Sequence, residues 1–582
     1  MSTLARLLKR LEVERDGLPV SVLRNPDLEP IPHAKRQWAF WSFFAYYGLP
    51  NVSAATFSIG SALLSLGLNI KQSIGTIVVG NIVITLYTVM NSNPGFKYHI
   101  GYTLEQRMLF GIRGSVIGII IRVGLSVVLY GYLSWLGALC LNLIFSSWSK
   151  SYMNMRNTFP ESVPMTTRDC VAFLIFQLIQ MPFCLLKPRK INTAGIAFCF
   201  MAMFSVIGIL AYTISANGGP GPLYYKSQDL TASQRAWTWL LAITIWYSGM
   251  SPVIANQSDY SRYGSHNLKM QIGIALGVCL TGTLAPVAGM FSASATQQLY
   301  GTPLWLPTDM SLKWLQDSYT AKARCAVFFI GLSFTGTQLV VNMTQNGYAC
   351  GMDLAGLFPK YVNITRGTLF VQLISWVVQP WTFFNTTSAF LDSMTSFGIF
   401  TTPIMAINVV DFYLVRKGRI SVAGLFTLDR EGAFWFYHGV NLRAIVALLV
   451  GIALGLPGLI FSVNTQLKPN TAMNNFYSGY TFFTVIVSGF LYYILVLIFP
   501  IKQRVAVSDS KDYFNAYSLE ECQKLDMVPY SENFDTEYIA LEKGQARDRV
   551  CVDHNDDDLP QSTHSMKTEA QMVIVEAASE KR

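Results

Sequence analysis

Long runs of apolar residues fill the middle of this 582-residue chain and limit what it can fold into. Hydrophobic residues make up 51% of the chain and charged residues only 13%, whereas a soluble domain carries roughly 25% charged residues. Polar sequence is concentrated in residues 1–36 and 501–582. This distribution excludes a soluble multidomain enzyme, a disulfide-stapled secreted protein and a disordered regulator. It predicts an all-α integral membrane protein embedded in a lipid bilayer.

Twelve apolar stretches are long enough to cross a bilayer, which takes about 20 residues per helix. We therefore predict a cytoplasmic N-terminal tail over 1–36, a twelve-helix membrane domain over 37–500, and a cytoplasmic, largely disordered C-terminal tail over 501–582. The boundary between the ninth and tenth stretches is the weakest, because only the polar residues 385–388 separate them. The predicted spans are 40–66, 73–91, 114–144, 169–186, 193–214, 236–257, 270–295, 324–345, 367–384, 389–413, 443–463 and 478–499.

The loops predict the orientation of the chain. With the N-terminus inside, the short cytoplasmic loops hold more Lys and Arg than the longer external loops, which follows the positive-inside rule. An even number of spans then places the C-terminus inside as well. Lys511, Lys524 and Lys543 in the C-terminal tail are candidate ubiquitin acceptors, with a ubiquitin ligase as partner, although ordinary solvated lysines are the simpler interpretation.

No motif predicts a metal, a cofactor or an enzyme. The nine cysteines form no CxxC pair and most lie in apolar runs, where Cys acts as a small hydrophobe. The six histidines are isolated, and HExxH, GxSxG and Walker loops do not occur. The chain has no basic stripe with interleaved aromatic residues, so nucleic-acid binding is not indicated. We attribute the net charge of +9 to the orientation of the chain in the membrane.

Two spans contain residues that interrupt helical hydrogen bonding at bilayer depth. The first span reads Tyr-Tyr-Gly-Leu-Pro-Asn-Val-Ser over 46–53, and the sixth reads Trp-Tyr-Ser-Gly-Met-Ser-Pro over 246–252. A break in hydrocarbon persists only around a cavity or a bound solute, and transporters place such breaks at matching positions around a midplane site. Their separation by five spans fits two inverted repeats of five helices followed by two extra helices. An ordinary proline kink in each span is the alternative.

The eighth span presents uncharged amides on one helical face. Gln338, Asn342, Gln345 and Asn346 follow the i, i+4, i+7, i+8 spacing of a single face. Amides on such a face bind a polar solute or join neighbouring helices. We expect solute contact for Asn346 and helix–helix contacts for most of the others.

Charged residues within or beside the spans are further candidates. Arg122 lies in the third span, where an ionisable group is a functional candidate by default, although a tilted helix would let it reach the membrane surface. Asp259 and Arg262 are expected at the cytoplasmic edge, where they can pair, cap helices or latch the inward gate.

Several segments resemble the nucleobase–cation symporter-1 family, specifically its fungal plasma-membrane permeases. The octapeptide Asn-Gln-Ser-Asp-Tyr-Ser-Arg-Tyr over 256–263 is similar to that of thiamine and nicotinamide riboside permeases, whereas uracil permeases carry a variant nearer Asn-x-Pro-Asp-Phe-Ser-Arg. The resemblance extends over about 23–530. The other segments that show the resemblance are 23–28, 98–101, 111–115 and 351–361.

The resemblance implies a LeuT-like fold and alternating access, with substrate held among helices 1, 3, 6 and 8 and helix 10 as an outer gate. It also implies that Trp246 stacks on the substrate ring and that Asn346 forms a hydrogen bond with it. Together with the two breaks, this gives the predicted substrate-binding residues Tyr47, Asn51, Ser53, Trp246, Gly249, Gln345 and Asn346.

Departures from the family pattern bear on the solute and the coupling ion. Leu129 and Leu133 replace a tryptophan and a glutamine that uracil-type members carry on helix 3. Val340 and Val341 stand where sodium-coupled relatives have Ser or Thr, so a coupling proton is expected. We therefore predict import of a small heteroaromatic vitamin- or nucleoside-like solute such as thiamine or nicotinamide riboside. A uracil-, uridine- or allantoin-type permease and a transport-incompetent nutrient sensor are the alternatives.

Overall fold

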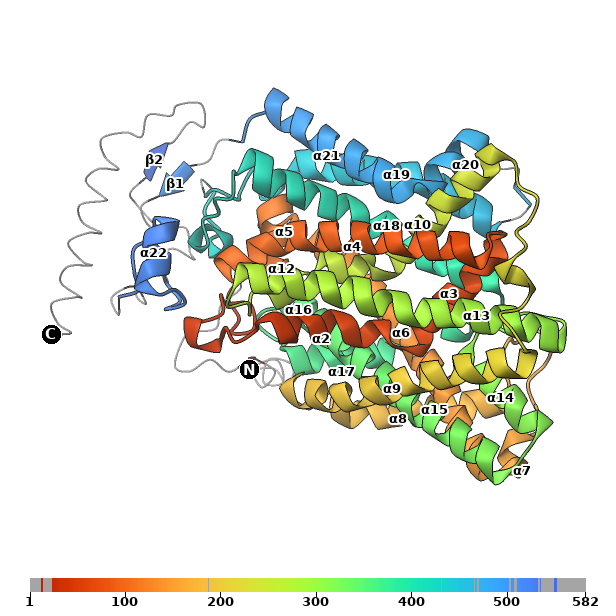
Figure 1. The fold of residues 1–582 in the computed structure, drawn as a ribbon. Coiled ribbons are helices and arrows are strands. Elements are labelled where there is room, and N and C mark those ends of the chain that lie inside the picture. Colours follow the sequence, from red (N-terminus) through yellow and green to blue (C-terminus); the bar gives the residue numbers. More distant parts are fainter. Residues whose placement is uncertain are drawn as a thin grey trace.

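The computed structural model describes residues 12–13, 23–186, 188–430, 432–464, 466–467, 470–501, 504–506, 510–531, 534 and 549–551. Nearly all regular structure in this part is helical, and the long helices lie side by side in one bundle (Figure 1). Two three-residue strands, β1 (Arg504–Ala506) and β2 (Arg549–Cys551), pair antiparallel beside the bundle. The prediction of an all-α protein is confirmed.

The first predicted span is broken, as expected. α2 (Phe40–Asn51) and the helix that follows it, α3 (Ala54–Leu63), meet at 57°. The Thr56 hydroxyl donates to the carbonyl of Pro50 (3.0 Å), and the Ser53 hydroxyl accepts from the Thr56 amide (3.4 Å). These side chains replace hydrogen bonds that the backbone loses at the break.

The break predicted within 246–252 of the sixth span is wrong. α10 (Ala232–Ala255) continues as a helix through Gly249 and Pro252, and the short α11 (Ser258–Ser261) follows a turn at residues 256–257. A proline interrupts a helix because it cannot donate to the carbonyl four residues earlier, and at Pro252 that carbonyl belongs to Ser248. The Ser251 hydroxyl donates to it instead (2.8 Å), so the helix continues.

The remaining helices before α10 are α4 to α9 with three short 3₁₀ segments. Their bounds are η1 (His33–Lys35), η2 (Leu64–Leu66), α4 (Ile70–Tyr98), α5 (Tyr102–Phe110), α6 (Ser115–Trp148), α7 (Lys150–Met153), α8 (Thr167–Phe183), α9 (Pro188–Asn217) and η3 (Pro222–Tyr224).

The second half repeats the pattern of long helices, three of which contain a π-helical segment (η4, η5 and η8). The bounds are α12 (Asn267–Leu276), η4 (Gly277–Thr281), α13 (Gly282–Tyr300), α14 (Pro307–Asp317), α15 (Ala321–Val341), η5 (Asn342–Gly347), α16 (Tyr348–Leu357), α17 (Ile364–Ile374), η6 (Ser375–Val378), η7 (Pro380–Phe384), α18 (Thr387–Val410), η8 (Asp411–Val415), η9 (Ala423–Phe426), α19 (Leu442–Val463), α20 (Thr471–Ser478), α21 (Tyr480–Ile498) and α22 (Leu519–Leu525).

The number of spans differs from the sequence count. Within the described residues, nine helices are long and apolar enough to cross a membrane, or ten if α2 and α3 form one span. Two predicted spans are shorter helices: α8 has 17 residues, and the other runs from Ile364 to Val378. The latter ends because Gln379 adopts a left-handed backbone conformation before Pro380. The count of twelve therefore stays a prediction.

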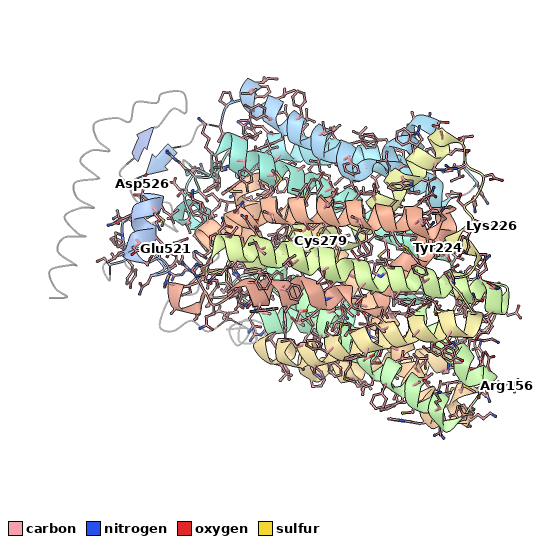
Figure 2. The ribbon with its side chains drawn as sticks, viewed as in Figure 1. Arg156, Tyr224, Lys226, Cys279, Glu521 and Asp526 are labelled. Atoms are coloured by element: carbon pink, nitrogen blue, oxygen red, sulfur yellow. The ribbon has the colours of Figure 1, made fainter. Side chains whose placement is uncertain are left out.

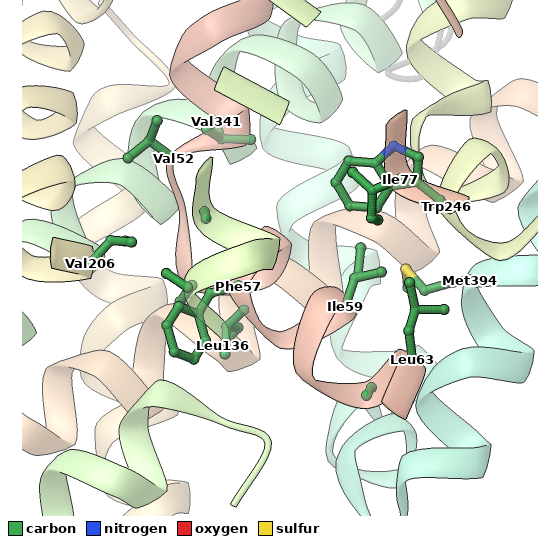
Figure 3. Close-up of a cluster of buried hydrophobic side chains, with 14 of the residues drawn as sticks. Val52, Phe57, Ile59, Leu63, Ile77, Leu136, Val206, Trp246, Val341 and Met394 are labelled. Atoms are coloured by element: carbon green, nitrogen blue, oxygen red, sulfur yellow. The ribbon is translucent and has the colours of Figure 1, made fainter. Parts of the chain in front are cut away.

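A hydrophobic core surrounds the α2–α3 break and joins both halves of the chain. Figure 3 shows part of it, with Ile59 of α3, Trp246 of α10 and Met394 of α18. α3 approaches α13 very closely at Gly60, where a Cβ atom would lie 2.3 Å from the backbone of Pro286. The broken helix is therefore held by packing on its neighbours as well as by hydrogen bonds.

The described parts of both tails lie at one end of the bundle (Figure 1). Arg36 forms an ion pair with Glu521 (2.7 Å), and the Tyr517 hydroxyl donates to the Tyr98 carbonyl (2.5 Å). Figure 2 shows Glu521 at this end and Arg156 at the opposite end. The predicted tails over 1–36 and 501–582 lie largely outside the described residues, so both tail boundaries and the disorder of the C-terminal tail stay predictions.

A buried ion pair joins the end of α18 to α5 and α21. Arg416 and Asp411 lie 2.6 Å apart, the Tyr492 hydroxyl donates to Asp411 (2.6 Å), and Arg416 donates to the Met108 carbonyl (3.3 Å). Both charged side chains are at most 1% exposed. Removing one partner leaves a buried charge without compensation, which costs far more than removing both.

We expect Arg416→Leu to lower the free energy of unfolding by about 3–5 kcal/mol. The double variant Arg416→Leu with Asp411→Asn should recover part of this loss, because no charge is then left unpaired. Thermal unfolding of the detergent-purified proteins measures both. A double variant no more stable than Arg416→Leu alone would show that this pair does not behave as a compensated buried charge.

Candidate functional site

A cavity of about 70 Å³ lies where α2 and α3 separate. Its walls come from the broken first span, α6, α10, the α15–η5 segment and α18, so both halves of the chain contribute. No lining residue carries a formal charge. The lining consists of Pro50, Ser53, Ala55, Thr56, Ile59, Leu129, Tyr132, Leu133, Trp246, Gly249, Met250, Pro252, Val253, Val341, Gln345, Asn346 and Met394.

Trp246 is the largest aromatic side chain in this lining, and α4 fixes its orientation. Its indole Nε1 donates to Asn81 Oδ1 (2.9 Å), and Asn81 Nδ2 donates to Thr283 Oγ1 (3.1 Å). Gly80 leaves room for the ring, since a Cβ atom there would lie 2.6 Å from Trp246 Cδ1. Asn81 and Gly80 were missed from the sequence. An asparagine in the middle of the apolar second span was the available signal.

The amide face of the eighth span divides into two roles. Asn342 Nδ2 lies within hydrogen-bond distance of Tyr130 O (3.1 Å), Ser134 Oγ (2.9 Å) and Gln180 Oε1 (3.1 Å), so it joins α15–η5 to α6 and α8. Among the residues that the structure describes, Asn346 donates only to Asn342 Oδ1 (3.0 Å), and it lines the cavity. Both lie in the π-helical η5, and such segments occur frequently at functional sites.

Five of the seven predicted binding residues line one cavity, and two lie outside its lining. Asn51 donates to the Gly277 carbonyl (3.5 Å) and Thr281 Oγ1 (3.3 Å) of η4, and the Tyr47 ring packs edge-on against Tyr46 at 5.2 Å. Their roles in substrate binding, and those of the five lining residues, stay predictions. The five are Ser53, Trp246, Gly249, Gln345 and Asn346.

The two leucines that depart from the family pattern lie in the wall of the cavity. Leu129 and Leu133 flank Tyr132 along α6 and give this side of the cavity an apolar surface. This wall therefore offers a substrate ring no side-chain amide.

A second, wider cavity of about 590 Å³ opens at the end where the tails lie, and we call it the vestibule. It shares Pro50 and Val341 with the first cavity. Tyr46 and Tyr260 stack at 4.1 Å between ring centroids, and the Tyr260 hydroxyl donates to the Thr344 carbonyl (2.8 Å). These contacts join α2, α11 and η5 where the vestibule meets the cavity.

Aromatic side chains pack at the opposite end of the cavity. Tyr132 of α6 stacks on Phe384 at 4.9 Å, and Trp305 contacts Phe390 of α18 at 4.9 Å. The cavity therefore lies between an aromatic cluster and the vestibule.

The predicted latch residues are buried and contact other elements. Asp259 Oδ1 accepts from the Tyr102 amide (2.9 Å), and Arg262 donates to the Asp27 carbonyl (3.2 Å). Asp259 and Arg262 are each 2% exposed to solvent. They tie α11 to the start of α5 and to the N-terminal segment, and their function as a gate latch stays a prediction.

Arg122 does not extend to the membrane surface. It is 2% exposed, donates to Ser126 Oγ (2.5 Å) and lies 3.5 Å from Asp353 of α16. Burial against a partner carboxylate explains why this charge is tolerated within the third span.

Comparisons with known proteins agree on the kind of protein this is. A family model described as permease for cytosine/purines, uracil, thiamine, allantoin matches residues 30–482. The chain is 42% identical to a thiamine transporter of Saccharomyces cerevisiae, over 94% of this chain and 91% of the relative. Its identity to nicotinamide riboside transporter 1 of the same organism is also 42%, over the same shares. The uracil permease of that yeast is 28% identical over 80% of this chain and 76% of its own length.

Solved structures share the fold. The inward-facing conformation of Mhp1 superposes with a TM-score of 0.65 at 19% identity, over 84% of this chain and 96% of that chain. Mhp1 in a closed conformation with bromovinylhydantoin bound gives the same TM-score and identity, over 86% and 99%. This likeness concerns the fold, and it confirms the predicted LeuT-like architecture.

The two asparagines of η5 should respond differently to substitution. We expect Asn342→Leu to lower the free energy of unfolding by about 1–3 kcal/mol, because it leaves buried partners on α6 and α8 unsatisfied. Asn346→Leu should have a much smaller effect, because only Asn342 is its partner. Thermal unfolding of the two purified variants compares them, and equal losses would contradict this division of roles.

Proposed function

The chain belongs to the nucleobase–cation symporter-1 family, and we propose that it imports a thiamine- or nicotinamide riboside-like solute across the plasma membrane by proton symport with alternating access. It is a transporter and not an enzyme. The observation that carries the choice of solute is the uncharged cavity at the α2–α3 break, where Trp246 lies near the amides of Gln345 and Asn346.

The lining suits a flat cation. Thiamine and nicotinamide riboside both carry a positively charged heteroaromatic ring, and a cation over an aromatic face gains about 0.5–2 kcal/mol. Trp246, with its ring fixed by Asn81, supplies such a face without a formal charge. Gln345 and Asn346 supply donors and acceptors for the polar groups of the solute.

The vestibule continues the row of cation-attracting aromatic side chains toward the cytoplasm. Trp38, Tyr46, Tyr260 and Tyr263 line it together with Asp259. Aromatic rings and a carboxylate attract a cation, so the solute would leave through this vestibule after Tyr46 and Tyr260 separate. The aromatic cluster of Tyr132, Phe384, Trp305 and Phe390 would open to admit it from outside.

A proton is the coupling ion that the side chains favour. Val340 and Val341 are buried on α15, and neither side chain offers the oxygen ligands that sodium requires. Orientation with both termini in the cytoplasm is supported by the described parts of the two tails, which lie at one end of the bundle, and by the basic loops.

The C-terminal tail offers one accessible candidate for a ubiquitin ligase within the described residues. Lys524 is exposed on α22, whereas the Lys511 ammonium lies 4.7 Å from the Phe534 ring centroid. Lys543 lies outside the described residues. Lys524 is therefore the first residue to test as an acceptor.

We expect labelled thiamine or nicotinamide riboside to accumulate in permease-deficient yeast cells that express this chain, and an uncoupler to abolish accumulation. Trp246→Ala should abolish uptake with unchanged surface expression, because the ring that holds the cation is lost. Uracil, uridine and allantoin serve as competitors. Normal uptake kinetics for Trp246→Ala would refute the site, and binding without any flux would indicate a nutrient sensor.

Leu133→Gln should shift specificity toward pyrimidinediones. An amide returned to the α6 wall would add hydrogen bonds worth on the order of 1–3 kcal/mol to a uracil-like ring. Inhibition of uptake by unlabelled uracil measures this, with Leu133→Met as the size-matched control. Equal inhibition by uracil in the two variants would show that this position does not read the substrate ring.

A further inference from the structure

Glu105 is a fully buried carboxyl group without a cationic partner. It lies in α5, which connects α4 to α6 outside the candidate spans, and every residue of α5 is buried. Glu105 is 0% exposed and forms no ion pair with any residue that the structure describes. By contrast, the buried Asp353 and Asp411 each face an arginine.

The surroundings of Glu105 favour its neutral form. Burial raises the pKa of the Glu105 carboxyl well above its usual value, and the charge of Asp259 raises this pKa further, while the side chains of Ser258 and Asn408 lower it. Burial without a cationic partner favours the protonated form of a carboxyl group.

Few other charges lie on α5 or on the elements packed against it. The acidic and basic residues there are Arg107 of α5, Asp259 of α11 with the adjoining Arg262, Asp353 of α16, Arg122 of α6, Arg443 of α19, Asp392 of α18, and the pair of Asp411 and Arg416, in which Arg416 donates to the Met108 carbonyl of α5. The tyrosines and cysteines of the same elements are Tyr102, Tyr130, Tyr132, Tyr260, Tyr348, Cys140 and Cys350.

The buried basic residues among these face other groups, and Arg416 pairs with Asp411. Arg122 faces Asp353, and Arg107 donates to the carbonyls of Leu23 (3.1 Å) and Leu425 (3.2 Å). Neither guanidinium is therefore placed to neutralise an ionised Glu105. The carboxyl group must exchange a proton when its surroundings become hydrated.

Hydrogen bonds connect Glu105 to the helix that carries Trp246. Asn408 Nδ2 lies within hydrogen-bond distance of Glu105 Oε2 (3.4 Å) and of Asn91 Oδ1 (2.6 Å). Asn91 Nδ2 in turn contacts the carbonyls of Ile254 (2.7 Å) and Ala255 (3.2 Å), at the end of α10. A change of charge on Glu105 therefore acts on the position of α10, four of whose residues besides Trp246 line the cavity.

Polar side chains occur on the helices that join Glu105 to the two cavities. Toward the vestibule, the Ser258 side chain lies beside Glu105, but neither Ser258 Oγ nor Glu105 Oε1 forms a hydrogen bond of normal geometry within the described part of the chain. The adjoining Asp259 lines the vestibule. Toward the site, the Thr401 hydroxyl donates to Ser251 Oγ (2.8 Å) on α10, two helical turns before Asn408 on α18. Buried polar groups without protein partners call for water or a transferable proton.

We propose that Glu105 carries the coupling proton. In the outward-facing state its carboxylate binds one proton from the external solution, which gives a neutral acid that the closed bundle accommodates. After the vestibule opens, the acid releases the same proton to the cytoplasm and becomes a hydrated carboxylate. This assignment rests on the proposed proton symport.

Glu105→Gln tests the assignment, because glutamine has the shape of the protonated acid and cannot release a proton. We expect proteoliposomes with this variant to lose proton-driven accumulation of labelled thiamine or nicotinamide riboside at least tenfold. Counterflow, in which internal unlabelled solute exchanges for external labelled solute, should stay within about twofold of wild type. Glu105→Asp should restore part of the accumulation.

The matched control is Asp169→Asn, which removes a buried carboxylate at the opposite end of the bundle. Asp169 accepts from Asn142 (2.7 Å) and Thr166 (2.6 Å), and its loss should leave the ratio of accumulation to counterflow unchanged. Accumulation by Glu105→Gln at the wild-type level would overturn the assignment. Loss of counterflow together with accumulation, in protein that still binds the solute, would also overturn it.

Two measurements on the wild-type protein separate this inference from the proposed function. If a pH gradient does not drive accumulation in wild-type proteoliposomes, the proton-symport proposal fails and the assignment fails with it. If it does, the infrared absorption of protonated carboxyl groups should lose one component in Glu105→Gln relative to wild type. An identical band in both proteins would overturn the assignment even if the variant were inactive.

Discussion

A bilayer offers no water to an exposed backbone group, so the broken first span must satisfy its own hydrogen bonds. It does so with two hydroxyl side chains: Thr56 donates to the Pro50 carbonyl and Ser53 caps α3. Close packing of Gly60 on α13 holds the bent segment in place. The 57° bend separates α2 from α3 and creates the cavity that the proposed transport requires.

The two halves of the chain supply different parts of the site. The first half contributes the break and the apolar α6 wall, whereas the second contributes the ring of Trp246 and the amides of η5. α10 reaches from this cavity to Asn91, and Asn408 links Asn91 to Glu105. Binding of the solute and binding of the proton would thus both affect the position of α10. Coupling between two ligands requires such a shared element.

The sequence was sufficient for the fold class and for five of the residues that line the cavity, because apolar run length and polar residues within those runs are local signals. It could not distinguish the two proline motifs. Pro50 and Pro252 have similar neighbours, but only at Pro252 does a hydroxyl, that of Ser251, restore the lost hydrogen bond within a continuous helix. Asn81 was missed because its contact with Trp246 spans 165 positions. Glu105 was missed because a short polar loop predicts exposure, whereas α5 is completely buried.

The most direct test of the account is an experimentally determined structure of the protein with thiamine or nicotinamide riboside bound. We predict density for the charged ring against the Trp246 indole at the α2–α3 break, with the polar groups of the solute facing Gln345 and Asn346. Density only in the vestibule, or a continuous α2–α3 helix with no solute beside it, would contradict the account.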